Sequence, residues 1–328
     1  MRIRLCKKLS LLVIALVFSC VAIAQSEPQF SQYMFNRMSY NPGYAGSSGS
    51  ICATAMYRNQ WMGLKLDTPT GGTEAGSTPT DYLFTFDMPV SFLHGGLGLT
   101  VVKDAIGYHD NIDVALDYAF RMFWGEGNLS AGAELGLRNN TFKLGDLHGN
   151  DSGDPTIAGQ TESDMLIDGS VGLYYQVPGK YYLGLSVKNL LAAHSDKTNT
   201  SNVRTVYAMG GYDITPAAAP SVRIKPSFLL KTANFSVFQA DLSCLLDYQN
   251  AFWAGLGYRV QDAVYLMAGV HMKKFRVGVS YDFTTSALGG PFKGGRSFGS
   301  LELYMRFCFK PVIPKKPDTR YRNTIWLE

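Results

Sequence analysis

The 328-residue sequence is long enough for two ordinary domains or for one large all-β unit. Its 30 Lys and Arg against 26 Asp and Glu give a formal net charge of +4, and residues 1–24 hold four of these basic residues and no acidic one. The remainder is therefore neutral, with 26 residues of each sign. It has no Lys/Arg-rich run, which excludes a basic nucleic-acid-binding protein.

The first 24 residues have the pattern of a secretory signal peptide. Residues 1–8 are basic, residues 9–21 form an apolar run of about 13 residues, and a small-x-small sequence ends at Ala24. The run is shorter than the roughly 20 residues of a membrane-spanning helix. Lipoprotein processing at Cys20 is the alternative, but bulky Phe18 lies where such sites have small residues. We therefore expect cleavage after Ala24.

Beyond the signal, apolar residues alternate with polar or small ones. In residues 275–283, for example, Phe, Val, Val, Tyr and Phe interleave with Arg, Gly, Ser and Asp. A period of two predicts strands with one apolar face, and Pro226 predicts a bulge because it cannot donate a ladder bond. Fourteen strands are expected: 50–61, 80–89, 96–103, 108–121, 128–139, 164–177, 180–190, 205–212, 221–232, 236–246, 251–260, 263–271, 274–283 and 300–309.

The connection lengths favour a transmembrane barrel over a soluble β-sandwich. Most expected strands have the length that a tilted strand needs to cross a bilayer. Long connections fall only between odd-numbered strands and their successors, so they share one rim, as in bacterial outer-membrane barrels. We predict an all-β, antiparallel transmembrane β-barrel of about 14 strands over residues 50–309, in a bacterial outer membrane. The long connections, expected to face the outside, are 62–79, 140–163, 191–204 and 284–299.

Two segments are expected to lie outside the barrel. Residues 25–49 form an N-terminal extension that is polar and aromatic without a clear period, and residues 310–328 form a short tail that is basic and rich in proline. An extended tail of this kind is typical of a periplasmic docking element, although a frayed terminus remains equally open. The candidate docking residues are Pro28, Gln29, Phe30, Tyr33, Lys315, Lys316, Arg320, Arg322 and Trp326.

Charged residues on the expected inner faces of the last strands suggest a lumenal charge network. Ion pairs that fill the interior are favoured over a selective passage, because unpaired charges in a narrow barrel are costly. The three cysteines beyond the signal, Cys52, Cys244 and Cys308, show no disulfide or zinc spacing, so we expect them to pack as apolar residues. The candidate network residues are Lys231, Asp241, Arg259, Arg276, Asp282, Glu302 and Arg306.

Signals of catalysis or metal binding are weak. G-x-S-x-G, P-loop and H-E-x-x-H motifs are absent, and the five histidines are scattered. Residues 146–154 are rich in oxygen ligands and leave calcium binding open, but they lack the ordered spacing of an EF-hand, which favours a solvated loop. We expect neither an enzyme nor a cofactor.

Six segments of the chain carry a family resemblance: PQFSQYMFN (28–36), YNPGYAG (40–46), YLGLSVKNLL (182–191), PSFLLK (226–231), FWAGLGYR (252–259) and VSYDFT (279–284). Through these segments the sequence resembles the PorP/SprF family of type IX secretion system membrane proteins of Bacteroidetes. It departs from the family at Leu301, where a His is common, and at Lys188, where a Pro is usual. No role of that His is carried over to this chain.

The resemblance implies a non-enzymatic component of the type IX secretion apparatus, which in some species also supports gliding motility. Its implied partners are periplasmic or lipoprotein components of that apparatus, and a secreted surface adhesin is a further implied client. An outer-membrane solute channel or transporter that works through its lumen remains the alternative function.

Overall fold

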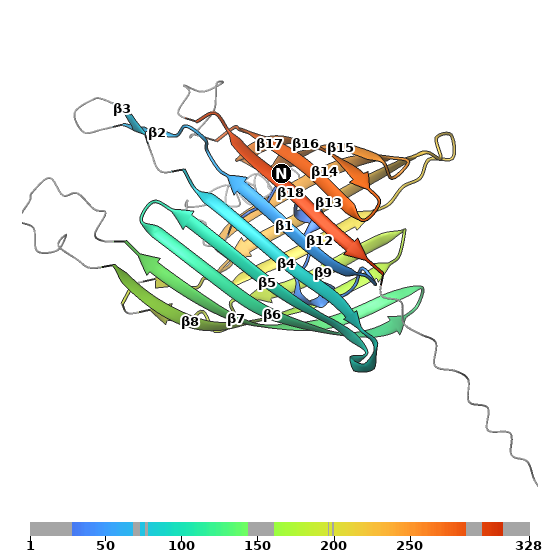
Figure 1. Ribbon diagram of the computed structural model, residues 1–328, viewed down its shortest axis with the longest axis horizontal. Coiled ribbons are helices and arrows are strands. Elements are labelled where there is room, and N and C mark those ends of the chain that lie inside the picture. Colours follow the sequence, from blue (N-terminus) through green and yellow to red (C-terminus); the bar gives the residue numbers. More distant parts are fainter. Residues whose placement is uncertain are drawn as a thin grey trace, which may run out of the picture.

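A closed antiparallel β-barrel forms the body of the protein (Figure 1). This computed structural model describes residues 28–67, 73–75, 78–143, 161–195, 197–198, 200–286 and 297–310. The barrel closes where the first strand pairs with the last, which lie side by side in Figure 1. Its strands are β1 (Ile51–Asn59), β4 (Thr80–Val90), β5 (Gly95–Ile106), β6 (His109–Trp124), β7 (Gly127–Phe142), β8 (Glu162–Val177), β9 (Tyr181–Lys188), β12 (Thr205–Tyr212), β13 (Val222–Ala233), β14 (Val237–Tyr248), β15 (Phe252–Arg259), β16 (Ala263–Met272), β17 (Phe275–Thr284) and β18 (Ser300–Phe309).

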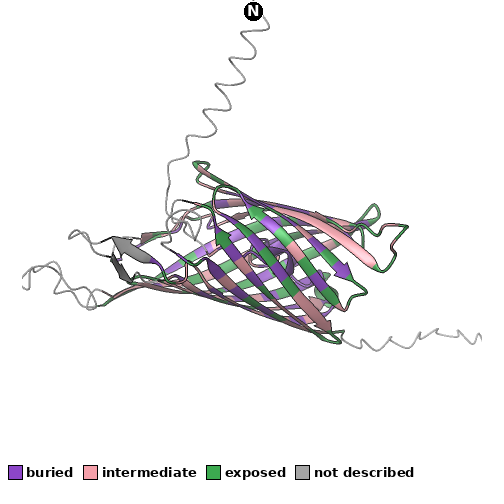
Figure 2. Ribbon diagram, turned by 90° about the horizontal axis from the view of Figure 1, so that it is seen from above, coloured by how far each residue is buried: buried purple, intermediate pink, exposed green. Residues whose placement is uncertain are grey.

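The alternation in the sequence becomes an apolar outer wall and a polar or tightly packed inner one. On β16, Tyr265 and Met267 are 0% and 3% exposed and point into the lumen, whereas Leu266 between them is 53% exposed. Figure 2 shows this alternation of buried and exposed residues along the strands. An apolar outer face suits hydrocarbon, and a closed ladder leaves no backbone edge unpaired within it.

The prediction of a 14-strand antiparallel barrel is confirmed, and each expected strand is present with its ends shifted by a few residues. Two short hairpins that were not predicted lie within long connections: β2 (Lys65–Asp67) with β3 (Thr73–Ala75), and β10 (His194–Ser195) with β11 (Thr200–Ser201).

The expected bulge at Pro226 is wrong, because the register of β13 with β14 runs through Pro226 without interruption. On its other side, β13 pairs continuously with β12 only from Ser227, opposite Gly211, to Ala233, so this ladder does not include Pro226. An isolated bridge between Ile214 and Ile224 follows beyond it.

The two rims of the barrel differ. The long-loop rim carries the connections 60–79, 143–161, 189–204 and 285–299. The short-turn rim carries turns such as 125–126 and 273–274, together with the start of β1 and the end of β18. The prediction that the long connections share one rim is therefore confirmed.

Residues 28–50, which we call the lumenal segment, are folded inside the barrel. They contain two short 3₁₀ turns, η1 (Tyr33–Phe35) and η2 (Pro42–Tyr44), whose residues are all buried. A third turn, η3 (Ser91–Leu93), lies on the short-turn rim. The expectation that residues 25–49 lie outside the barrel is wrong for residues 28–49. Their aromatic residues lack a period because they pack in several directions, against inward side chains of many strands.

Candidate functional site

The wall of the barrel is shaped to receive the lumenal segment. A Cβ atom at Gly132 of β7 would overlap the backbone of Gly43, and one at Gly172 of β8 would overlap the Asn41 side chain. The Asn41 amide donates to the Leu173 carbonyl oxygen at 2.9 Å and its side-chain oxygen accepts from the Gly43 N–H. Glycine at these two wall positions therefore lets the η2 turn lie directly on the sheet.

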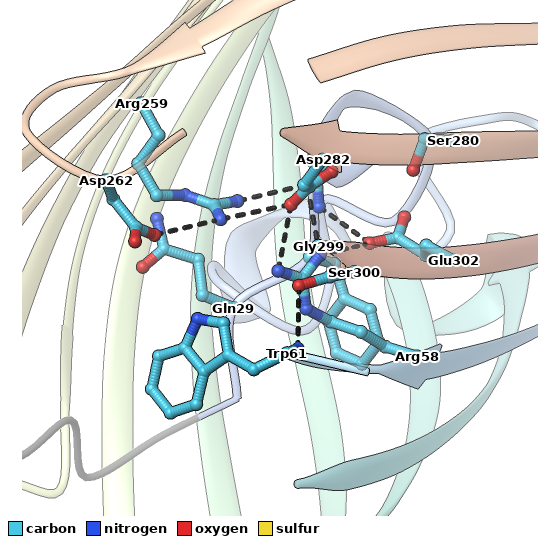
Figure 3. A network of polar contacts seen from close by, with 12 residues as sticks. Gln29, Arg58, Trp61, Arg259, Asp262, Ser280, Asp282, Gly299, Ser300 and Glu302 are labelled. Atoms are coloured by element: carbon cyan, nitrogen blue, oxygen red, sulfur yellow. Dashed lines mark hydrogen bonds and ion pairs between the residues drawn. The ribbon is translucent and has the colours of Figure 1, made fainter. Parts of the chain in front are cut away.

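Five charged side chains form a buried group near the long-loop rim, which we call the ion network. Figure 3 shows Arg58, Arg259, Asp282 and Glu302 of this network. Arg58 contacts Asp282 at 2.9 Å and Glu302 at 3.2 Å, while Arg259 contacts Asp241 at 2.8 Å and Asp282 at 3.4 Å. Each of the five side chains is at most 2% exposed. They come from β1, β14, β15, β17 and β18, so the network ties together strands from both sides of the barrel closure.

Every carboxylate of the ion network also accepts a hydrogen bond from the lumenal segment. The N–H groups of Ser31 and Gln32 donate to Glu302 at 2.7 and 2.9 Å. The Ser31 hydroxyl donates to Asp282 at 2.7 Å, and the Gln29 amide donates to Asp241. Charge-assisted bonds of this kind are stronger than neutral ones. The ion network therefore holds the first described residues of the chain in the half of the lumen nearest the long loops.

Aromatic packing holds the middle of the lumenal segment. The Phe35 ring lies 4.7 Å from that of Trp253 and 4.8 Å from that of Tyr304, measured between centroids. The Tyr33 hydroxyl is 3.0 Å from the Ser243 hydroxyl. These rings belong to one buried cluster with inward side chains of strands around the barrel, so the middle of the lumen is filled.

Four of the seven predicted lumenal charges meet in one group, and three do not. Asp241, Arg259, Asp282 and Glu302 meet in the ion network. The other three residues lie elsewhere: Arg276 and Arg306 contact Phe35 nearer the short-turn rim, and Lys231 is buried on β13 opposite Gln239.

Arg58 and Asp87 were not among the predicted residues. Arg58 lies on the buried positions of β1, which alternate in the sequence as 52, 54, 56 and 58, so the same periodicity could have identified it. Asp87 on β4 lies 3.7 Å from Arg306.

Cys52 and Cys308 form a disulfide, with their Cα atoms 4.2 Å apart. The expectation that both pack as unpaired apolar residues is wrong. Barrel closure places β1 beside β18, which brings together two residues separated by 256 positions in the sequence. Cys244 on β14 keeps a free thiol and is half-buried.

The candidate docking residues of the lumenal segment are not available to a partner in this structure. Gln29, Phe30 and Tyr33 are at most 4% exposed, because their side chains face the barrel interior, and Pro28 is half-buried. We therefore withdraw the docking role of Gln29, Phe30 and Tyr33. The tail residues Lys315, Lys316, Arg320, Arg322 and Trp326 lie outside the described residues.

The oxygen-rich loop 146–154 also lies outside the described residues. Within the part of the chain that the structure describes, no three His, Cys, Asp or Glu side chains gather as a metal site would require. In that same part, no helix has the length and apolar character needed to cross a membrane.

Several solved structures resemble this chain in fold and have little sequence similarity to it. The Acinetobacter baumannii outer membrane protein Omp33 is 8% identical, with a TM-score of 0.45 over 79% of this chain and 99% of that one. A Pseudomonas aeruginosa FadL homologue is 11% identical, with a TM-score of 0.41 over 86% and 95%. The COG4313 outer membrane channel of Pseudomonas putida F1 is 11% identical, with a TM-score of 0.40 over 88% and 100%.

Sequence comparison identifies the family. No curated protein matches the chain. The family of type IX secretion system membrane proteins PorP/SprF matches residues 22–307, which is nearly the whole barrel together with the lumenal segment. The chain is an outer-membrane β-barrel that belongs to the PorP/SprF family of type IX secretion system membrane proteins.

Proposed function

We propose that this protein is a non-enzymatic docking component of the type IX secretion apparatus, with a barrel that is closed by its own lumenal segment. In this role it holds periplasmic or lipoprotein components of the apparatus at the inner side of the outer membrane. Handling of a secreted surface adhesin, and through it a contribution to gliding motility, is part of the same proposal. Family membership supports the assignment to the apparatus.

The filled lumen is the observation that carries the docking role. A channel needs a continuous aqueous path, whereas here residues of the lumenal segment and of the wall form one buried cluster across the barrel. The segment is held by the ion network at one end and continues directly into β1 at the other. A barrel of this kind offers its rims and its C-terminal residues to partners rather than a passage to solutes.

A solute channel is the competing function. It requires the lumenal segment to leave the lumen, which breaks its hydrogen bonds to three buried carboxylates and exposes its aromatic residues. We therefore expect the purified protein to be silent in planar bilayers and its liposomes not to swell in sugars. A stable, ohmic conductance of the wild-type protein would favour the channel.

Affinity purification from native membranes tests docking directly. We expect the full chain to recover type IX secretion components, and a variant truncated after Lys310 to recover fewer while remaining a folded, heat-modifiable barrel. The matched control replaces Lys315, Lys316, Arg320 and Arg322 by Gln at full length, which separates charge from tail length. If the truncated protein folds, secretes and recovers partners as the full chain does, the tail has no docking role. If the full chain recovers no component, the docking function itself is wrong.

A further inference from the structure

A cavity of about 360 Å³ lies between the lumenal segment and the short-turn rim, and we call it the rim cavity. Its position follows from its lining, which includes the start of β1, the ends of β16 and β18, and the turn 273–274. Its volume lies in the range of ordinary ligand pockets. Six basic residues line it: Arg37, Lys225, Lys273, Lys274, Arg276 and Arg306.

The positive charge of the rim cavity is only partly compensated. Asp213 is the one acidic residue of the lining. Outside the lining, Asp247 lies 2.8 Å from the Lys225 ammonium, and Asp87 lies 3.7 Å from the Arg306 guanidinium. Even with these three carboxylates counted, the basic residues are in excess.

Two guanidinium groups of the lining contact no carboxylate among the described residues. Arg37 donates to the Tyr174 hydroxyl at 2.9 Å and to the Met34 carbonyl oxygen at 3.1 Å, and it lies 3.6 Å from the centroid of the Tyr182 ring. Arg276 donates to His271 at 2.9 Å. Both residues are half-buried. A cation that is partly removed from water without a counter-charge is costly, so an anion that enters the rim cavity gains more here than at an exposed lysine.

We propose that the rim cavity is a binding site for an acidic peptide segment of a periplasmic partner, which inserts clustered carboxylates between these basic residues. The site is larger than a single anion requires, because the exposed Lys273 and Lys274 continue the positive surface onto the rim. The packed residues of the lumen close the rim cavity on its inner side. A cavity closed in this way suits a docked peptide segment rather than a solute that passes through the barrel. This proposal rests on the docking function and names the chemistry of its partner.

The chain's own tail fits this site poorly. Residues 311–328 carry Lys315, Lys316, Arg320 and Arg322 against Asp318 and Glu328, a net positive charge that a basic cavity repels. The matching charge must come from another molecule. Because the start of β1 lies on the same rim as the end of β18, one partner could contact both the rim cavity and the tail.

The test is direct binding of a fluorescein-labelled octaglutamate peptide to the purified full-length protein in detergent micelles, followed by fluorescence anisotropy. We expect saturable binding that weakens as salt increases, and no binding of an octalysine peptide. The double substitution K273Q/K274Q, at two exposed positions, should weaken binding several-fold. Arg276→Gln should weaken it about tenfold or more, and Arg276→Lys should retain most of the affinity. The matched control is Arg204→Gln, an exposed arginine near the long-loop rim, which should leave binding unchanged.

Three results overturn the proposal. The first is no binding of octaglutamate to the wild-type protein, and the second is that K273Q/K274Q and Arg276→Gln both bind the peptide as tightly as the wild type does. The third is displacement of the labelled peptide by inorganic phosphate that is as effective per mole as displacement by unlabelled peptide. The last result identifies a small-anion site. If Arg276→Gln fails to show heat-modifiable mobility, the exposed pair alone decides. The binding assay is separate from partner recovery. Peptide binding without recovered secretion components contradicts the docking function, whereas recovery without peptide binding contradicts only the rim cavity.

Discussion

Replacing Arg58 by Met should loosen the lumenal segment without opening the wall. Arg58 is 1% exposed and contacts Asp282 and Glu302, and it also donates to the Ser31 hydroxyl at 3.1 Å. Methionine fills similar space but leaves Glu302 without a cation. Removing one partner of a buried pair typically costs about 3–5 kcal/mol. The backbone ladders of β1 remain intact, so most of this cost should fall on the segment that the ion network anchors.

Planar-bilayer recording provides the assay. A loss of about 3–5 kcal/mol corresponds to a roughly hundred- to several-thousandfold rise in the population with a released segment. We expect the wild-type protein to be silent and Arg58→Met to show brief openings. The segment should also become sensitive to limited proteolysis while the barrel keeps its heat-modifiable mobility.

The matched control is Arg223→Met. Arg223 lies 3.3 Å from Asp247 but is 33% exposed, and Asp247 keeps Lys225 as a partner, so its loss should cost at most about 1 kcal/mol and cause no openings. Adding Glu302→Gln to Arg58→Met should reduce the openings, because the carboxylate left without a cation is then neutral. Arg58→Met that stays closed and protease-resistant would refute the anchoring role of the ion network.

Three further predictions concern processing, the disulfide and topology. N-terminal sequencing of the mature protein should begin directly after Ala24, and a lipid-modified Cys20 would contradict this. Cys52→Ser/Cys308→Ser, or reduction of the wild type, should lower stability to urea by roughly 2–4 kcal/mol, whereas Cys244→Ser should not; equal midpoints would show that the disulfide does not stabilise the fold. Single cysteines placed in the long connections should react with an impermeant reagent on whole cells, and silence of all four would reverse the proposed orientation. The connections to be labelled are 62–79, 140–163, 191–204 and 284–299.

The strands could be predicted from the sequence because each wall residue faces one of two different environments. Lipid on one side and a packed, polar lumen on the other make apolar and polar or small residues alternate with a period of two, as on β16. This alternation is visible within each short stretch of the sequence. The same reasoning placed Asp282 and Glu302 in the lumen. Applied to β1, it would also have identified Arg58, because its position continues the alternation of Cys52, Thr54 and Met56.

The lumenal segment could not be found in this way. Its residues contact strands all around the barrel, so their spacing reflects the shape of the cavity and not a repeat. Tyr33 packs near Ser243, for example, and Phe35 near Trp253. The disulfide was missed for a related reason: Cys52 lies near the start of the first strand and its partner near the end of the last, and only the register at closure makes them neighbours.

The direction in which the lumenal segment runs constrains where a fusion can be attached. Gln29 and Ser31 are bound in the half of the lumen nearest the long loops, and the chain then descends to the short-turn rim, where β1 begins. Anything attached ahead of Pro28 must therefore be accommodated at the long-loop end of an already filled barrel. A bulky affinity tag at this position would have to fit at the long-loop end of the lumen, beside the ion network. A fusion intended to leave the packing of the lumen undisturbed therefore belongs after Lys310 rather than ahead of Pro28.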